Sequence, residues 1–141
     1  MDVRPYAAHD RAACVAVFDS LTPALLDANV RPQFESWLEN PSGPYFVMEH
    51  DGSIVGCGGY TLSPDGATAT LEWGMIRADT QKVGLGRFLL MYRIREIGGH
   101  GTVAIVLANP PHASAGFFEK QGFHRGNADP ETYIKKLTVC H

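Results

Sequence analysis

Apolar and polar positions in the first forty residues predict two amphipathic helices. One helix runs from a cap at His9 or Asp10 to about residue 21, and a second covers residues 32–39. The positions that define their apolar stripes are Ala13, Val17 and Leu21 in the first helix and Phe34, Trp37 and Leu38 in the second. Pro41 and Pro44 then end the helical pattern.

The next stretch predicts a meander of three antiparallel strands, over residues 45–49, 53–62 and 67–76. Asp51-Gly52 and residues 63–66 are typical of the tight turns that join such strands. The middle strand contains three glycines, Gly56, Gly58 and Gly59. They indicate a bulge or a close approach by another group, or simply packing against a bulky neighbour such as Trp73.

The second half of the chain alternates helices and strands. We expect helices over residues 87–97 and 114–121, a buried strand over 103–108, and strands that begin at Phe123 and cover 133–139. A short strand at residues 2–6 precedes them all. This order predicts an α+β fold, in which a mixed and mostly antiparallel sheet is flanked by about four helices. A length of 141 residues fits a single domain over residues 1–141.

Composition excludes several classes of protein. A net charge of −3 provides no basic footprint, so we expect no nucleic-acid partner. The three cysteines are scattered and form no metal-ligand pattern, which favours reduced thiols, no metal site and a cytoplasmic location. The N-terminus is not typical of a signal peptide, and no apolar run approaches the ~18 residues that span a bilayer, so no membrane association is expected.

The segment Gln81-Lys82-Val83-Gly84-Leu85-Gly86-Arg87 lies between a predicted strand and a predicted helix. Glycines in such a turn let backbone N–H groups approach a ligand, and the helix N-terminus favours an anion. Lys82 and Arg87 add positive charge. The spacing matches neither a P-loop nor G-x-G-x-x-G. The segment therefore predicts an anion site of another kind, with a plain turn as the alternative.

The pattern Q-x-x-G-x-G resembles the motif of the GNAT superfamily of N-acetyltransferases. Residues 76–80 precede it as the family's V-x-P-x-x does, with Ala78 where proline is common. Ser114-Ala115-Gly116-Phe117-Phe118-Glu119-Lys120-Gln121-Gly122-Phe123 resembles a second family block, A-x-x-[FL]-Y-E-K-x-G-F. The resemblance covers residues 45–123 well and the two ends loosely.

The resemblance implies the GNAT fold and acetyl-CoA as cosubstrate. It implies that the pyrophosphate lies on the N–H groups of residues 81–87 and that the pantetheine arm pairs with the backbone of residues 75–77. The residues it assigns to acetyl-CoA are Met75, Ile76, Arg77, Gln81, Lys82, Val83, Gly84, Leu85, Gly86, Arg87, Asn109, Ser114 and Phe118. Asn109 enters because Pro111 stands where family members often have asparagine.

The same resemblance suggests three catalytic residues. Strand alternation places Glu72 on the face of Gly74 and Ile76, opposite Leu71, Trp73 and Met75, so Glu72 is the candidate base. Its alternative is a carboxylate on a solvated strand face. Glu49, near the end of a neighbouring strand, is a weaker candidate for the base. The N–H near Gly74 is the candidate oxyanion donor.

The last catalytic candidate concerns the departing thiolate. Phe118 stands where many family members have a tyrosine that protonates this group. Ser114, His112 or solvent could replace that tyrosine, although Ser114 could equally be only a helix N-cap.

We therefore expect an acetyltransferase that moves an acetyl group from acetyl-CoA to a primary amine of a small molecule or peptide, by direct attack in a ternary complex. The protein would act as a monomer or homodimer. Four aromatic residues are candidates either for the acceptor site or for the core: Phe34, Trp37, Tyr60 and Tyr133. The alternatives are a catalytically weak acyl-CoA-binding regulator or sensor, and an interaction domain whose glycine turn binds nothing.

Overall fold

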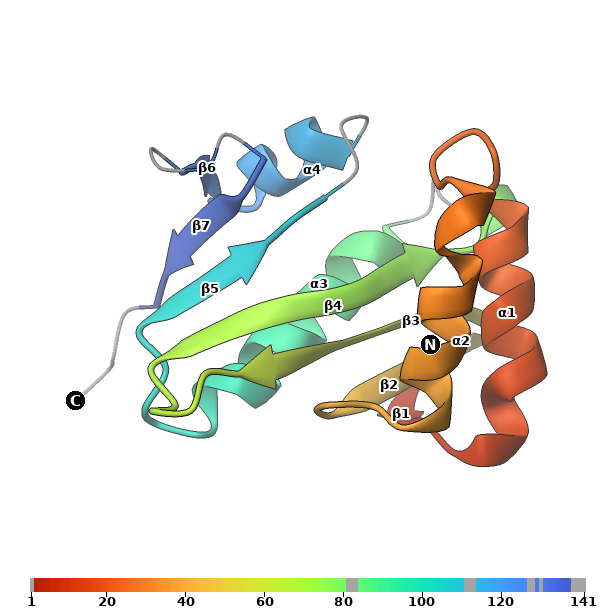
Figure 1. The fold of residues 1–141 in the computed structure, drawn as a ribbon, viewed down its shortest axis with the longest axis horizontal. Coiled ribbons are helices and arrows are strands. Elements are labelled where there is room, and N and C mark those ends of the chain that lie inside the picture. The colour runs from red at the N-terminus through yellow and green to blue at the C-terminus, as the bar shows by residue number, and fades with distance from the viewer. Residues whose placement is uncertain (1, 81–83, 111–113, 127–128, 130, 138–141) are drawn as a thin grey trace.

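The structure, a computed structural model, describes residues 2–80, 84–110, 114–126, 129 and 131–137. Within them lies a seven-stranded sheet in the order β1-β2-β3-β4-β5-β7-β6 (Figure 1). The strands are β1 (Asp2–Pro5), β2 (Tyr45–His50), β3 (Ser53–Leu62), β4 (Thr68–Ile76), β5 (Ile105–Ala108), β6 (His124–Arg125) and β7 (Tyr133–Lys136). The pair β4–β5 is parallel and the other described pairs are antiparallel. This arrangement confirms the mixed, mostly antiparallel sheet expected from the sequence.

Helices cover both faces of the sheet. Their bounds are α1 (Arg11–Ser20), α2 (Arg31–Glu39), α3 (Leu85–Gly98) and α4 (Ala115–Lys120). The apolar faces of α1 and α2 pack with Tyr45, Val47 and Cys57 in one buried cluster. Helices α3 and α4 pack with residues from the opposite face, including Phe46 and Tyr60, in a second cluster. Figure 1 shows α3 behind the sheet and α1 and α2 in front of it.

The stripe on α1 differs by one position from the prediction. Cys14, Val17, Phe18 and Leu21 are buried, whereas Ala13 is only half-buried. Positions 14, 17, 18 and 21 have the i, i+3, i+4, i+7 spacing of a helix that packs one face on a sheet. The stripe on α2 lies as predicted, because Phe34, Trp37 and Leu38 are all buried.

The hairpin between β2 and β3 turns at Asp51-Gly52 as predicted. Both residues have positive φ, 53° at Asp51 and 80° at Gly52. Two consecutive residues of this kind form the turn that matches the right-handed twist of the flanking strands.

Strand β4 contains a bulge opposite the glycines of β3. Cys57 pairs with Met75 and Gly59 pairs with Glu72, so Trp73 and Gly74 together face the single residue Gly58. Trp73 has a φ of 47°, in the left-handed region. The extra residue shifts the side-chain alternation of β4 by one position. A bulge was one of the readings of the β3 glycines, and the structure confirms it.

Strands β4 and β5 pair only at their start. Thr68, Ala69 and Thr70 pair with Ile105, Val106 and Leu107, and the register ends there. Beyond this point the two strands diverge, as Figure 1 shows. Among the described residues, the rest of β4, including the bulge, therefore has no strand beside it on the β5 side.

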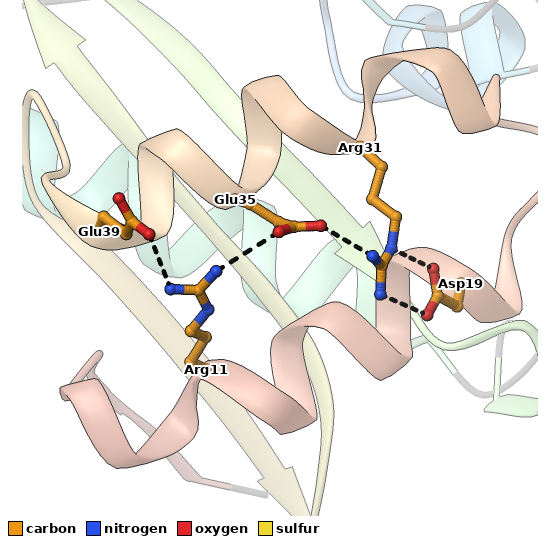
Figure 2. A network of polar contacts seen from close by, with 5 residues as sticks. All are labelled: Arg11, Asp19, Arg31, Glu35 and Glu39. Carbon is orange, nitrogen blue, oxygen red and sulfur yellow. Dashed lines mark hydrogen bonds and ion pairs between the residues drawn. The ribbon is translucent and has the colours of Figure 1, made fainter.

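A network of charged side chains joins the outer surfaces of α1 and α2 (Figure 2). Arg31 holds Asp19 through two hydrogen bonds of 3.0 and 3.2 Å and Glu35 through a third of 2.8 Å. Arg11 reaches Glu35 at 3.4 Å and Glu39 at 3.1 Å. Single surface pairs contribute little, but a shared network fixes the angle between the helices. This packing positions α2 over the bulged part of the sheet, where Phe34 contacts Trp73.

In the described part of the chain, none of the helices is long and apolar enough to cross a bilayer. The described His, Cys, Asp and Glu side chains form no group of three or more placed to hold a metal ion. Cys14 and Cys57 are buried free thiols, and Cys140 lies outside the described residues.

Candidate active site

The β4 bulge is fixed by a tyrosine two strands away. The buried Tyr45 hydroxyl donates a hydrogen bond of 2.9 Å to the backbone carbonyl of Trp73. The Tyr45 ring is itself held by edge contacts with Tyr6, Phe34 and Trp37. Burial raises the pKa of Tyr45 well above its ordinary value, so the hydroxyl remains a donor at neutral pH.

This hydrogen bond also sets the direction of the next N–H group. In a planar trans peptide the N–H lies opposite the C=O, so the Gly74 N–H is turned away from Tyr45. Gly74 is exposed and has no partner in the β3–β4 register. The arrangement can present an N–H donor to a group that lies along the unpaired part of β4, which is the geometry of an oxyanion site.

The prediction that Glu72 shares a face with Gly74 and Ile76 is wrong, because the bulge lies between them. Glu72 pairs with Gly59, which pairs with Tyr45, and cross-strand partners share a face. Glu72 therefore lies on the α1–α2 face. Gly74 and Ile76 lie on the opposite face, because a Cβ at Gly74 would meet Arg93 of α3 and Ile76 packs beside Leu85 and Leu89.

The core residues of β4 are divided by the same shift. The sequence predicted that Leu71, Trp73 and Met75 share one face. Leu71 instead packs in the cluster of α3 and α4, whereas Trp73 and Met75 pack against α1 and α2. The physical reason is the extra residue of the bulge, which breaks the period of two between Leu71 and Trp73.

Glu72 is half-buried, and this burial raises the pKa of its carboxyl group above the ordinary value. The side chain forms no hydrogen bond or salt bridge with another described residue, and desolvation is the cause of the shift. Glu49, the weaker candidate base, is engaged by Arg4 at 2.8 Å. Of the two, Glu72 has the carboxylate that is free to accept a proton.

The described part of the glycine turn before α3 begins at Gly84. Gly84 is the N-cap of α3, with a φ of 77° that L-residues rarely adopt. Gly84 is exposed, and a Cβ there would meet nothing within 4 Å. At Gly86 a Cβ would lie 3.7 Å from Phe117 and 3.8 Å from Ile76, which are ordinary contact distances. The protein itself therefore leaves room at both glycines.

The other predicted phosphate contacts divide into three kinds. Gln81, Lys82 and Val83 lie outside the described residues. Leu85 is buried and packs beside Met48 and Val55, so only its backbone can face a ligand. Arg87 is exposed on the first turn of α3. Over the described residues, an anion site here consists of the α3 N-terminus and one adjacent guanidinium.

The predicted pantetheine contacts on β4 also differ from one another. The Arg77 N–H donates to the Val55 carbonyl at 2.7 Å, and the Arg77 carbonyl accepts from the N–H and hydroxyl of Thr80 at 3.0 and 2.9 Å. Both backbone groups of Arg77 are thus engaged inside the protein. Met75 and Ile76 pair with Cys57 and Gly56 of β3, and their side chains lie in the core on opposite faces.

The segment after β5 contains the remaining predicted residues. The Asn109 side-chain oxygen accepts a 2.7 Å hydrogen bond from Thr132, which ties the end of β5 to the loop before β7. Ser114 is the N-cap residue of α4, but its side chain makes no capping hydrogen bond. Pro111 and His112 lie outside the described residues.

Phe118 is part of an aromatic cluster. Its ring packs edge-on against Phe117 and Phe123, each with a centroid distance of 5.3 Å. Phe118 has no group that can transfer a proton. Its position can therefore shape the apolar wall beside α4 but cannot supply an acid.

A cavity of about 270 Å³ opens beside the end of β5. Its lining residues are Asn109, Pro110, Ala115, Arg125, Asp129, Glu131 and Tyr133. Phe34, Trp37, Tyr60 and Tyr133 are all at most 9% exposed, so the four aromatic candidates for the acceptor site are core residues. Tyr133 alone among these four also contributes to this cavity.

Sequence reasoning missed Tyr45 and Arg93. Arg93 of α3 is 4% exposed and lies against Gly58 and Gly74. A signal for Arg93 was present, because it falls at i+4 from Leu89 and i−4 from Ile97, within the buried stripe of the helix. For Tyr45, which begins an apolar strand, the pattern contains no comparable signal.

Comparison with known proteins agrees with this geometry. The profile of the acetyltransferase (GNAT) family matches residues 13–123. A GNAT-family acetyltransferase from Staphylococcus aureus superposes with a TM-score of 0.77 at 15% identity, over 97% of this chain and 99% of that one. The ribosomal-protein-alanine N-acetyltransferase from Brucella melitensis gives 0.72 at 19% identity, over 97% and 100%. Comparison with curated protein sequences found no match.

A third similar structure contains bound coenzyme A. The N-acetylglutamate synthase from Neisseria gonorrhoeae, complexed with coenzyme A and L-arginine, superposes with a TM-score of 0.76 at 18% identity. The match covers 96% of this chain but only 33% of the synthase, so the chain spans about a third of that protein's length. The family profile covers most of the sequence, and the chain belongs to the GNAT family of acetyltransferases. Its class is therefore that of the acetyltransferases.

Proposed function

We propose that this protein transfers an acetyl group from acetyl-CoA to a primary amine of a small molecule or peptide, by direct attack in a ternary complex. One observation carries the proposal. The Trp73–Gly74 bulge lies where β4 has left β5, and Tyr45 holds its peptide so that the Gly74 N–H is turned outward. Such a fixed donor favours the charge that develops on a carbonyl oxygen during acyl transfer.

The residues present fit acetyl-CoA as the donor substrate. Gly84 and Gly86 leave the start of α3 open, and Arg87 is exposed beside it, which suits a pyrophosphate group. Met75 and Ile76 are the proposed contacts of the pantetheine arm on β4. Gln81, Lys82 and Val83 remain predicted contacts of the same phosphate site, which lie outside the described residues.

Glu72 acts in this proposal as the base. An alkylamine has an ordinary pKa near ~10.4 and must lose a proton to attack. Glu72 takes one proton from the ammonium group before the attack. As the neutral amine nitrogen bonds to the acyl carbon, the carbonyl electrons move to oxygen, which accepts a hydrogen bond from the Gly74 N–H. The C–S bond then breaks, and the nitrogen loses its second proton to solvent. The raised pKa of Glu72 makes it a better proton acceptor than an exposed glutamate.

The departing thiolate lacks the tyrosine acid found in many family members, because Phe118 occupies that position. Ser114 makes no capping hydrogen bond and is the candidate that could pass a proton from solvent. A thiolate is stable near neutral pH compared with an alkoxide, so an acid is less necessary than in ester chemistry. We therefore expect turnover to survive without a dedicated acid.

The acceptor amine would enter from the cavity at the end of β5. Asp129 and Glu131 line it and favour a cationic amine, while Arg125 could pair with a carboxylate on the same acceptor. Two of the similar structures are named for such products or acceptors, one as an N-acetylglutamate synthase and the other as a ribosomal-protein-alanine N-acetyltransferase. For this chain, amino acids and peptide N-termini are therefore the first acceptors to test.

The direct test measures release of CoA thiol from acetyl-CoA with a panel of amines. The panel contains amino acids, peptide N-termini, lysine peptides, polyamines, arylalkylamines and aminoglycosides. Release that saturates with one class, together with the acetylated amine seen by mass spectrometry, supports the proposal and identifies the acceptor. No release with any class, in a protein that binds acetyl-CoA, contradicts it.

That negative outcome would favour the second candidate, a catalytically weak acyl-CoA-binding regulator or sensor. The observation behind it is Phe118, which replaces a proton donor by a ring packed against Phe117 and Phe123. The regulator is expected to bind acetyl-CoA and to gain thermal stability from it without turnover. An absence of any CoA-dependent shift would contradict both candidates.

A further inference from the structure

Arg93 is a buried cation with few partners. It lies in the middle of α3 and is 4% exposed. Its one hydrogen bond to a described residue runs from Nη1 to the Gly59 carbonyl at 3.3 Å, and its buried Nε has no partner there. None of the salt bridges among the described residues includes it. Burial of a charge with so little compensation is costly, so a purely structural role would be better filled by an apolar residue.

The guanidinium lies directly beneath the β4 bulge. A Cβ at Gly74 would come within 2.6 Å of Nη2 and 2.9 Å of Nη1. A Cβ at Gly58, the residue opposite the bulge, would lie 3.1 Å from Cζ. Gly58 and Gly74 are thus needed to admit the guanidinium between the sheet and α3. The bulge and the buried cation form one unit.

The Arg93 guanidinium is positively charged near neutral pH. Desolvation lowers the pKa of Arg93 to about 10, which still leaves the group protonated near neutral pH. The surroundings are apolar, since the α3 neighbours Leu89, Leu90 and Ile97 are fully buried. A positive charge in such surroundings acts over a longer distance than one in water.

We infer that Arg93 supplies the positive field of the oxyanion site, acting across the Gly74 backbone on the charge that forms at the acyl carbonyl and then on the departing thiolate. This inference rests on the proposed acetyl transfer. Negative charge develops on the carbonyl oxygen when the neutral amine attacks, and it passes to sulfur when the C–S bond breaks. A fixed cation beside Gly74 favours both charged states. Because Arg93 acts through the bulge, it is a positioning residue.

This role also accounts for Phe118. Where the tyrosine acid is absent, a nearby cation stabilises the thiolate as it departs unprotonated. One proton leaves the ammonium group through Glu72 before the attack, the second leaves the nitrogen to solvent, and the thiolate takes its own proton from solvent afterwards. No further reactant is required.

The test compares Arg93→Met, Arg93→Gln and Arg93→Lys with the unmodified protein. Met is apolar and similar in length, Gln retains a donor for the Gly59 carbonyl without charge, and Lys retains the charge. We expect Met and Gln to lower kcat about 100-fold with little change in the KM for acetyl-CoA, and Lys to recover a large part of the loss. Met should fold with an equal or higher Tm, because it removes a buried charge.

A second readout does not depend on turnover. The thiol of bound CoA can be titrated through the ultraviolet absorbance of its thiolate. Its pKa should be about one unit higher in Arg93→Met than in the unmodified protein, whereas free thiols titrate near ~8.5. If Met does not fold, Gln serves for both measurements.

The outcomes separate the two proposals. If the unmodified protein releases no CoA thiol with any amine, the proposed function fails, and the thiol titration then decides the role of Arg93 alone. If the unmodified protein is active and Met and Gln keep kcat within twofold with an unchanged thiol pKa, the inference about Arg93 is wrong. A loss of acetyl-CoA affinity with unchanged kcat would also contradict it.

Discussion

The Tyr45 hydroxyl donates a hydrogen bond to the carbonyl of Trp73, 28 positions later in the chain. This contact joins the first strand of the meander to the bulge of the third. It fixes a residue that would otherwise leave the left-handed region, since Trp73 has a φ of 47°. The direction of the Gly74 N–H depends on this one donor.

Removal of that donor should therefore affect rate more than binding. In Tyr45→Phe the Trp73 carbonyl loses its partner, and we expect a cost of about 1–3 kcal/mol in the free energy of unfolding. The bulge peptide is then free to rotate, so kcat should fall about tenfold or more while the KM for acetyl-CoA changes little. Chemical denaturation and steady-state kinetics measure the two effects.

Tyr60→Phe is the matched control. Tyr60 is equally buried, and its hydroxyl lies 2.8 Å from His100 on the opposite face of the sheet. Its loss should lower stability by a similar amount without changing kcat at saturating substrates. Equal effects of the two substitutions on kcat would show that Tyr45 acts through general stability alone.

Glu72→Gln tests the base. We expect kcat to fall by about 10²–10³. In the unmodified enzyme, kcat/KM should rise with pH as the Glu72 carboxyl loses its proton, and the midpoint should lie above the ordinary glutamate pKa because burial raises it. That acid limb should disappear in Glu72→Gln.

Glu72→Gln should lower kcat without lowering the free energy of unfolding. The folded-state pKa of Glu72 is raised, so its ionisation costs stability as the pH rises, and Glu72→Gln should be neutral or stabilising near pH ~7. Glu49→Gln is the control. Glu49 is paired with Arg4, so its substitution is expected to leave the acid limb in place. An acid limb that persists in Glu72→Gln would exclude Glu72 as the base.

Gly86→Ala tests whether the glycine is needed for binding of CoA and not for folding. The added Cβ makes only ordinary contacts with Phe117 and Ile76, so the substitution should not destabilise the fold. A phosphate that approaches the backbone would meet the new methyl group, and the affinity for CoA should fall about tenfold or more, as measured by calorimetry. Gly86→Val should weaken binding further.

Substitutions at Gly84 and Gly98 serve as comparisons for Gly86→Ala. Gly84→Ala and Gly84→Val combine the same obstruction with a strained φ of 77°, so stability and affinity should both fall. Gly98→Ala lies in the same helix with open space around it and should raise stability by ~0.5–1 kcal/mol without affecting CoA. Unchanged CoA affinity in the Gly84 and Gly86 variants would remove the phosphate-site argument.

The sequence predicts most of the fold because local rules decide it. Gly84 needs a positive φ, Asp51-Gly52 forms the hairpin turn, and α2 buries the stripe that its spacing indicates. The face of Glu72 could not be predicted in the same way. A single extra residue at Trp73 reverses the alternation, and no local pattern shows in which strand a bulge places its extra residue.

The catalytic surroundings depend on contacts between distant segments. Tyr45 meets Trp73 only after β3 has paired with both β2 and β4, and periodicity carries no information on that contact. Arg93 is different, since its place in the apolar stripe of α3 was visible in the sequence. A charged residue inside a buried stripe conflicts with the local pattern, and such conflicts concentrate at functional sites.

The last prediction concerns acid stability. Asp10 is 2% exposed and accepts hydrogen bonds from Arg4 at 2.8 and 2.9 Å and from the Ala7 N–H at 2.9 Å. These partners, Arg4 foremost, lower the pKa of Asp10 to about 2. A lowered folded-state pKa gives stability that is present above the unfolded pKa, near ~3.9, and is lost as the pH falls toward the folded value.

Asp10→Asn should remove this contribution. We expect its Tm to lie on the order of 5 °C below that of the unmodified protein at pH ~7, and the gap to close between pH ~4 and pH ~2. Asp65→Asn is the control, because Asp65 also has a lowered pKa but lies on an exposed turn and should change Tm little. A gap that stays constant down to pH ~2 would mean that Asp10 stabilises the fold through packing and not through its charge.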